Sequence, residues 1–334
     1  MIAVSPAVQN RTLDSRKMVV RALLSAVLSL LSAGSSTAFA RDPIQLGPAP
    51  ELSVGSTTGD GVTLTVSDLR QEEIGDSALT REFVGAGKVF QVVHVTMRNR
   101  SRKTYYPSPL DFVMLDSDAN RYKWWPVHRS MTAGFPDGKE VLEPGESASA
   151  DVSFALPRSK TPAAIEWGTP SLIEANAPTA AAIGTRVVLI PDKAGHPVSS
   201  LRPHGPTGVT SQLGVTVRLG KAQVVALPAS VGSRVPPGFI VETIAGTMEN
   251  QTNGTLEVHT EDFIALDSRA LPSAYLLRKD PLAMDNLYIK AGKTLSGNLT
   301  YIVPSSDPPI AIRWTPVGFI GHDPPSNKII MLPH

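Results

Sequence analysis

The sequence predicts an all-β protein, built as two tandem immunoglobulin-like β-sandwiches that follow a signal peptide. Three observations support this fold class: short runs of alternating apolar and polar residues, frequent proline and glycine between the runs, and an internal repeat. Alternation with a period of two places apolar side chains on one face of a strand, and regular turn residues separate the strands of a sandwich. The 29 prolines argue against long helices, because proline removes a backbone donor and clashes with the preceding turn.

The first 40 residues have the three parts of a secretory signal peptide. An apolar run over residues 22–33 follows a basic segment and precedes the small-residue cleavage site Ala38-Phe39-Ala40. This run is shorter than the roughly 20 residues that a membrane-spanning helix needs. We therefore expect a secreted or periplasmic protein without a membrane span. Either Met1 or Met18 can serve as the start, since a complete signal peptide remains after Met18.

The internal repeat consists of three ungapped blocks. Residues 93–117 align with 244–268 at an offset of 151, residues 145–167 align with 292–314 at an offset of 147, and residues 186–191 align with 328–333. The blocks predict a first domain over residues 41–192 and a second over 211–334, which we name repeat 1 and repeat 2. Residues 193–210 lie between them, and their proline and glycine content predicts an extended tether.

The expected strands occur in the same order in both repeats. In repeat 1 they cover residues 61–66, 93–99, 152–157 and 165–167, and in repeat 2 residues 214–219, 244–250, 299–304 and 312–314. Trp167 and Trp314 end the last of these segments, and we expect each to anchor a core because burial removes a large aromatic surface from water. Gly145 and Gly292 are expected in turns that require a positive φ.

The order of these segments resembles the DUF4352-type immunoglobulin-like sandwich, which is related to secreted mycobacterial antigens of the MPT63 kind. In repeat 1 the resemblance rests on the segments 61–66, 93–99, 107–112, 142–146 and 152–157, and repeat 2 shows the same order. The resemblance implies an extracellular binding or cell-envelope role and supplies no catalytic residues. Relatives are often lipoproteins, whereas this chain has no cysteine to carry a lipid.

Charge and cysteine content narrow the possible functions. Residues 1–40 hold four of the 31 basic and one of the 30 acidic residues. The rest of the chain therefore has 27 basic and 29 acidic residues and a net charge of −2. This balance argues against nucleic-acid binding, which favours strongly basic domains. Because the chain has no cysteine, it has no disulfide, thiol nucleophile or thiolate metal site.

The two repeats differ most in one loop, which gives the candidate binding site. Repeat 1 carries Arg100, Arg102, Lys103 and Tyr106 there, whereas repeat 2 carries the stretch 249–254, which has no positive charge. We add Trp125, because adjacent tryptophans on a strand point to opposite faces and one of Trp124 and Trp125 then faces outward. Arginine beside aromatic residues suits an anionic glycan, a teichoic-type phosphate or a peptide carboxylate. The alternative is a solvated hairpin tip without a ligand.

We expect neither an enzyme nor a cofactor or metal site. The sequence has no nucleophile elbow, zinc-binding helix motif or phosphate-binding loop. Asp116, Asp118 and Asn120 have the spacing of the first EF-hand ligands, but Arg121 and Val127 replace the required Gly and Glu, so a polar turn is expected. The sequence thus predicts a binding or cell-envelope protein whose partner is an unknown exported protein or an anionic envelope glycan. The alternative is an accessory subunit of an exported complex that pairs through a strand or a sandwich face.

Overall fold

The computed structural model describes residues 50–73, 87–107, 111–123, 141–168, 186–226, 235–258, 262–273, 275–276, 287–315 and 327–334. These residues form strands and turns, and no helix occurs among them. The all-β prediction is therefore confirmed. The expected signal peptide and Trp125 lie outside the described residues. None of the described segments is a helix long and apolar enough to cross a membrane.

The strands of repeat 1 are β1 (Glu51–Val54), β2 (Ser56–Gly59), β3 (Val62–Glu72), β4 (Lys88–Asn99), β5 (Phe112–Asp116), β6 (Arg121–Lys123), β7 (Ser147–Pro157), β8 (Pro162–Trp167) and β9 (Arg186–Leu189). The strands that follow are β10 (Val209–Gln212), β11 (Val215–Val224), β12 (Phe239–Asn250), β13 (Leu256–Val258), β14 (Phe263–Leu266), β15 (Tyr275–Leu276), β16 (Leu287–Ile289), β17 (Lys293–Pro304), β18 (Ala311–Trp314) and β19 (Lys328–Met331).

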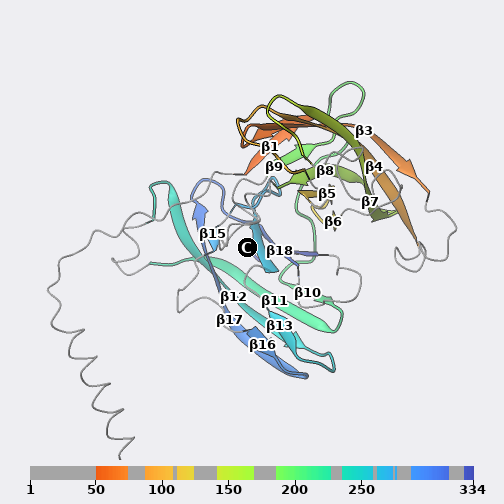
Figure 1. The fold of residues 1–334 in the computed structure, drawn as a ribbon. Helices are drawn as coiled ribbons and strands as arrows, with labels where there is room; N and C mark the ends of the chain where they lie inside the picture. The colour runs from red at the N-terminus through yellow and green to blue at the C-terminus, as the bar shows by residue number, and fades with distance from the viewer. Residues whose placement is uncertain are drawn as a thin grey trace, which may run out of the picture. The chain divides into compact units, whose positions relative to one another are not determined.

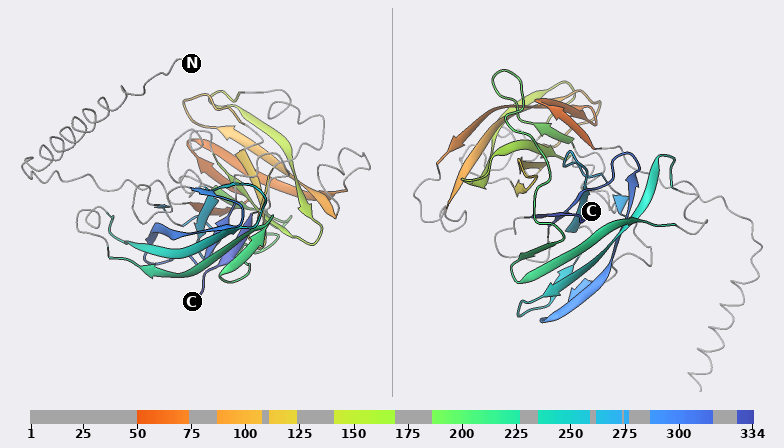
Figure 2. Two further views of the ribbon diagram at one scale, coloured as in Figure 1. Left: turned by 90° about the horizontal axis from the view of Figure 1, so that it is seen from below. Right: turned by 180° about the vertical axis from the view of Figure 1, so that it is seen from behind.

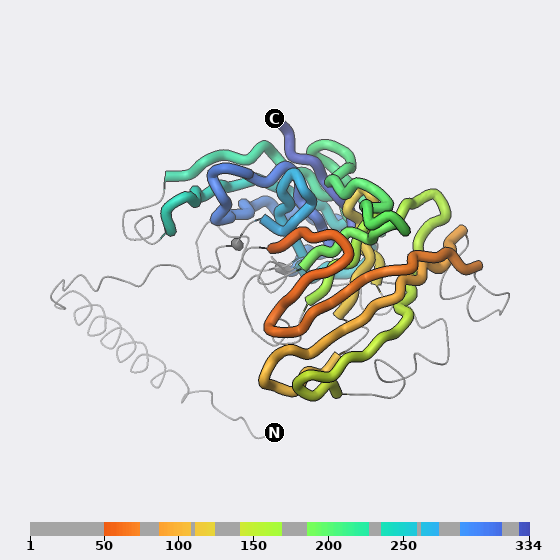
Figure 3. The backbone as a smooth tube through the Cα atoms, turned by 90° about the horizontal axis from the view of Figure 1, so that it is seen from above, coloured from red at the N-terminus to blue at the C-terminus, as the bar shows by residue number. Residues whose placement is uncertain are grey.

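The strands of repeat 1 form two sheets, in the orders β1-β9-β8-β5-β6 and β2-β3-β4-β7. Figure 1 labels all of these strands except β2, and Figure 3 shows β3, β4 and β7 side by side as orange to yellow-green tubes. One apolar core joins the two sheets, because alternate residues of β3, β4 and β7 pack with residues of β5, β8 and β9. Trp167 is fully buried in this core, as predicted.

The strands of repeat 2 form sheets of the orders β10-β11-β12-β17-β15, β14-β18-β19 and β13-β16. Figure 2 shows them in green to blue from two further directions. Residues from all three sheets enclose one apolar core, in which Trp314 is fully buried. The long pairing of β12 with β17 repeats that of β4 with β7, so both repeats use the same central pair of strands.

The first hairpin of each repeat closes with the same two-residue turn. Asp60-Gly61 joins β2 to β3 with φ angles of 52° and 80°, and Leu213-Gly214 joins β10 to β11 with φ angles of 50° and 76°. Two successive positive φ angles are the mark of a type I′ turn, whose twist matches that of the flanking strands. Position 61 also has no room for a side chain, because a Cβ there would lie 2.8 Å from Ser101.

The segment 193–210, predicted as an extended tether, makes backbone hydrogen bonds to both repeats. Arg202 N donates to Ser117 O at 3.1 Å in repeat 1, and Met331 N donates to Pro206 O at 2.9 Å in repeat 2. Gly205 packs so closely that a Cβ at this position falls against Ile329 O. The segment is therefore held against both repeats, and Gly205 allows its backbone to lie close to Ile329.

A third apolar core contains residues of both repeats. Leu115 and Ala164 of repeat 1 pack in it with Leu266 and Ala311 of repeat 2. At its border the fully buried Arg313 Nη1 donates to Glu166 Oε2 at 3.2 Å. Burial is the main reason why the pKa of Arg313 falls to about 10, and the carboxylate of Glu166 opposes that fall. The contact between the repeats is thus apolar with a buried charge pair.

Candidate functional site

The candidate binding loop of repeat 1, residues 100–106, is built on the buried Asn99 at the end of β4. The Asn99 Nδ2 donates to Lys103 O and to Leu142 O, both at 2.8 Å. Its Oδ1 accepts from Ser101 N at 2.9 Å. A buried Asn that satisfies three backbone groups fixes the course of a loop, since each group is costly to leave unpaired. The loop is therefore held on its inner side by one residue.

Repeat 2 holds its corresponding loop in the same way. Asn250 Nδ2 donates to Gly254 O and to Ile289 O, both at 2.7 Å, and Asn250 Oδ1 accepts from Thr252 N at 2.9 Å. The repeat alignment anticipated this match, because Asn99 and Asn250 are equivalent in sequence. Both Asn side chains are used within the fold, although each begins an Asn-x-Ser/Thr triplet.

The side chains predicted to bind are exposed to solvent. Arg100, Arg102 and Lys103 are exposed, and Tyr106 is 63% exposed. These four residues lie on one exposed loop because they are close in sequence, whereas Trp125 lies outside the described residues. The repeat 2 equivalents of the three cations are Gln251, Asn253 and Gly254. The charge difference between the two loops is therefore a surface difference on a matched backbone.

The neighbouring Tyr105 belongs to the core rather than to the loop surface. Its hydroxyl donates to Asp111 Oδ2 at 3.1 Å, and burial is the main cause that raises its pKa. The aromatic difference between the repeats is smaller than the sequence suggested. Tyr288 of repeat 2 is 68% exposed and pairs across strands with Glu257, the equivalent of Tyr106. Positive charge, not an exposed tyrosine, is what distinguishes the loop of repeat 1.

An acidic residue lies beside the candidate loop. Thr104 Oγ1 donates to Glu143 Oε2 at 3.0 Å, which places a carboxylate at the base of the loop. A carboxylate there lowers the local positive potential.

The polar sequence after β5 forms a turn. Asp116 Oδ1 accepts from Asp118 N and Asn120 N, both at 2.9 Å. Asp118 Oδ2 accepts from Lys160 Nζ at 2.6 Å, and this hydrogen bond raises the pKa of Lys160. Asp267 accepts in the same way from Arg269 N and Leu271 N. These hydrogen bonds explain the Asp and Asn residues of the sequence as turn formers, as expected.

Among the described residues no group of three acidic, His or Cys side chains is arranged to hold a metal ion.

Sequence reasoning missed a polar row on the sheet β2-β3-β4-β7. His94 lies between Ser67 and Asp151 in the strand register, and its Nδ1 is 2.9 Å from Asp151 Oδ1. Arg70 Nη2 donates to Asp151 Oδ2 at 2.7 Å, and this bond is the main cause that lowers the pKa of Asp151. The alternation of β4 places His94 opposite the core, but sequence alone does not say which residues lie beside it.

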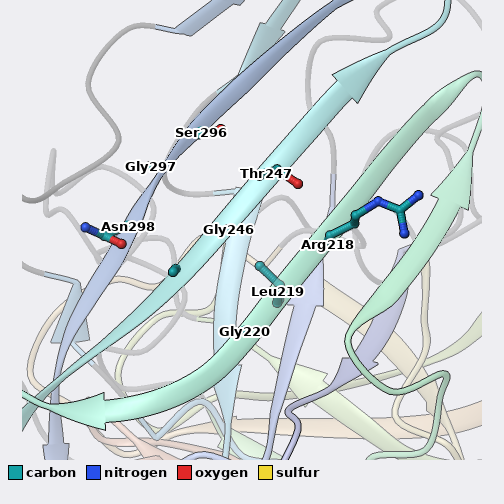
Figure 4. A pocket seen from close by; sticks show the side chains of 9 residues that line it. Arg218, Leu219, Gly220, Gly246, Thr247, Ser296, Gly297 and Asn298 are labelled. Carbon is teal, nitrogen blue, oxygen red and sulfur yellow. The ribbon is translucent and has the colours of Figure 1, made fainter.

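Repeat 2 has a shallow hollow of about 600 Å³ at the same place on its sheet. Figure 4 shows its lining residues on three neighbouring strands, β11, β12 and β17, with Arg218 at one side. The equivalents of His94 and Asp151 are Ala245 and Asn298, which pair across β12 and β17. The hollow lies where Ala245 stands in place of His94 and where Gly220, Gly246 and Gly297 bring no side chain to the sheet surface.

Residues 53–177 match the family model described as a domain of unknown function, DUF4352. The matched range lies within repeat 1 and includes no part of repeat 2. No curated protein matches the chain.

Three solved structures are similar to parts of this chain. A candidate lipoprotein, ycdA, from Bacillus subtilis strain 168 is 18% identical, with 37% of this chain and 38% of that one covered and a TM-score of 0.31. The yjhA protein of Bacillus subtilis is 10% identical, with 41% and 98% covered and a TM-score of 0.30. The secreted protein MPT63 of Mycobacterium tuberculosis is 14% identical, with 36% and 91% covered and a TM-score of 0.27. The chain therefore spans well under two thirds of the ycdA protein.

Proposed function

We propose that this protein is an exported, non-enzymatic binding protein that engages an anionic envelope glycan through the loop 100–106 of repeat 1. It acts outside the cytoplasm, in the periplasm or as a secreted protein, as a tandem pair of immunoglobulin-like sandwiches. Repeat 2 supports or extends the binding repeat. The secreted MPT63 and the candidate lipoprotein ycdA, among the similar structures, are compatible with an envelope role.

The observation that carries the proposal is the charge of one loop on a matched scaffold. Asn99 and Asn250 hold the two loops with the same hydrogen bonds, so the backbone gives no reason for a difference in side chains. Arg100, Arg102 and Lys103 are nevertheless exposed cations in repeat 1 alone. Arginine forms paired hydrogen bonds with carboxylate and phosphate groups, and an exposed tyrosine packs against a sugar ring. Tyr106 supplies that ring, and Trp125 is the further aromatic residue that we include.

The proposal is tested by retention of the mature protein on isolated cell envelopes and on immobilised anionic glycan. The variant Arg100→Ala, Arg102→Ala, Lys103→Ala should lose at least about tenfold in retention, because three exposed charge contacts are removed. Retention of the unchanged protein should also fall as salt rises, since exposed charges are screened.

A matched control removes the same charge from repeat 2 through Arg218→Ala, Lys221→Ala and Lys293→Ala, three exposed residues. This control should keep full retention. Equal retention of both triple variants contradicts the site. If both variants keep their glycan retention and one exported protein elutes with the chain in stoichiometric amount, the alternative role as an accessory subunit is favoured.

A further inference from the structure

The apolar contact between the two repeats uses equivalent residues from each. Four pairs of the third core are matched by the repeat alignment: Leu115 with Leu266, Ala119 with Ala270, Ala164 with Ala311, and Val187 with Ile329. The partly buried Leu189 and Met331 form a fifth matched pair at its edge. An interface made from the same patch on both partners is the pattern of a symmetric dimer.

The buried charge pair obeys the same relation. Glu166 and Arg313 occupy the same place in the repeat, before Trp167 and Trp314 respectively, and they contact each other at 3.2 Å. In a two-fold arrangement, a residue that contacts its own equivalent lies close to the symmetry axis. The two repeats therefore face each other as the subunits of a dimer do, with different charges at the centre.

Two equivalent alanines lie in turns at the contact between the repeats. Ala119 and Ala270 are fully buried in the shared core with φ angles of 69° and 62°. Each lies in a turn in which its backbone N–H donates to the carbonyl oxygen of Asp116 or Asp267, respectively. A positive φ is unusual for alanine, and Gly or Asn is the common choice. A small apolar side chain at both turns instead lets the two repeats pack against each other in the shared core.

The charges decide which repeats can pair. Two copies of repeat 1 in this arrangement bring two Glu166 carboxylates together, and two copies of repeat 2 bring two buried Arg313 side chains together. Like charges removed from water repel strongly and select against such a pairing. Arg121 Nη2 also donates to Glu166 Oε1 at 2.9 Å, so Glu166 lies between cations of both repeats. The equivalent of Arg121 is Pro272, which adds no charge on the other side.

We infer that each repeat carries a recognition face for the other, and that Glu166 and Arg313 set the pairing of repeat 1 with repeat 2 as a covalently linked heterodimer. The partner of this face is a β-sandwich of the same kind with the opposite central charge. The inference rests on the proposed tandem arrangement but not on the ligand of loop 100–106. Binding to glycan and pairing of the repeats can therefore fail separately.

The test starts from the full chain with a protease site inserted in the exposed turn at residues 192–197. After cleavage, the two fragments should remain together as one species of the intact mass in analytical ultracentrifugation at micromolar concentration. Arg313→Glu in the same cleaved protein should raise the dissociation constant of the fragments about 100-fold or more, because two buried carboxylates then meet. Arg218→Glu makes the same substitution at an exposed position of repeat 2 and should leave the association unchanged.

Circular dichroism and the fluorescence of the buried tryptophans report whether the fragments stay folded. Should Arg313→Glu unfold repeat 2, Arg313→Met provides the second variant, since it keeps an apolar stem and should weaken association about tenfold. Separation of the unmutated fragments into independent folded species overturns the inference. So does association that neither Arg313 variant weakens relative to Arg218→Glu.

Discussion

The two repeats share their backbone devices and differ in their exposed side chains. Both use a two-residue turn with positive φ, a buried Asn that holds a loop, and a buried Trp before the last strands. On the outside, repeat 1 carries a basic loop and a charged row around Asp151, while repeat 2 carries a loop without positive charge and a shallow hollow. The comparison teaches that the fold depends on a few internal residues and leaves the surface free to specialise.

The contact between the repeats contains residues that are neither scaffold residues nor surface residues. Glu166 and Arg313 are buried like scaffold residues, yet they differ between the repeats like surface residues. A buried ion pair contributes little net stability, but the loss of one partner is costly. Difference at a buried position therefore indicates recognition between the repeats rather than support of either core.

The largest expected effect comes from the two Asn residues that hold the loops. Asn99→Ala and Asn250→Ala should each lower the free energy of unfolding by roughly 2–3 kcal/mol, because backbone groups near them lose buried partners. The measurement is denaturant unfolding of each variant. Ser101→Ala and Thr252→Ala, which remove the neighbouring hydroxyl only, serve as milder controls.

Equal losses in the two Asn variants support the equivalence of the repeats. A difference between them greater than about 1 kcal/mol breaks the comparison, since the hydrogen bonds that the two side chains make are the same within the structure.

The first hairpin turns give an intermediate effect in the opposite direction. Leu213 has a φ of 50° and is 54% exposed, while its equivalent in repeat 1 is Asp60. A left-handed conformation strains leucine but suits Asn. Leu213→Asn should therefore raise the free energy of unfolding by about 0.5–1 kcal/mol. Thermal unfolding checks this, with Leu213→Ala as the control that removes the apolar side chain and keeps the strain. A stability gain from Leu213→Ala that equals that of Leu213→Asn refutes strain as the cause.

The smallest effect is a pH dependence specific to repeat 1. The hydrogen bond from Arg70 is the main cause that lowers the pKa of Asp151 in the folded protein. A lowered folded pKa adds stability above the unfolded value of about 3.9, and this stability disappears as pH falls through the folded pKa. Both side chains are about 40% exposed, so solvent screening limits the gain to less than about 1 kcal/mol.

Asp151→Asn introduces the residue that repeat 2 has at the equivalent position, Asn298. At pH 6 the variant should be slightly less stable than the unchanged protein, and at pH 2 the two should be equal. A stability difference that persists at pH 2 assigns the effect to packing rather than to the charge of Asp151.

Much of the scaffold could be predicted because its signals are local. The alternation of apolar residues indicated the strands, and Gly145 and Gly292 have the positive φ angles that their turns required, 89° and 66°. Burial of both tryptophans followed from their size and their place on a strand. The three cations of the candidate loop were also accessible to sequence reasoning, because a charge run in one repeat stands against an uncharged stretch in the other.

The features that escaped prediction depend on neighbours far apart in the chain. His94 and Asp151 are separated by 57 positions, and Glu166 and Arg313 by 147. The repeat alignment showed Glu166 and Arg313 as equivalent residues but gave no reason for them to touch. Equivalence in sequence is a relation between two segments of the chain, whereas contact depends on how the folded segments pack.

The amino-acid sequence by itself determined the β-strands, the turns and the positive charge of the loop 100–106, since each of these depends on residues that are near one another along the chain. Only the tertiary structure decided which side chains share a sheet face, how segment 193–210 is anchored, and that the two repeats bury equivalent residues against each other. The physical reason is that strand register and the packing of one sheet on another set these neighbours, and both depend on long-range burial of apolar surface.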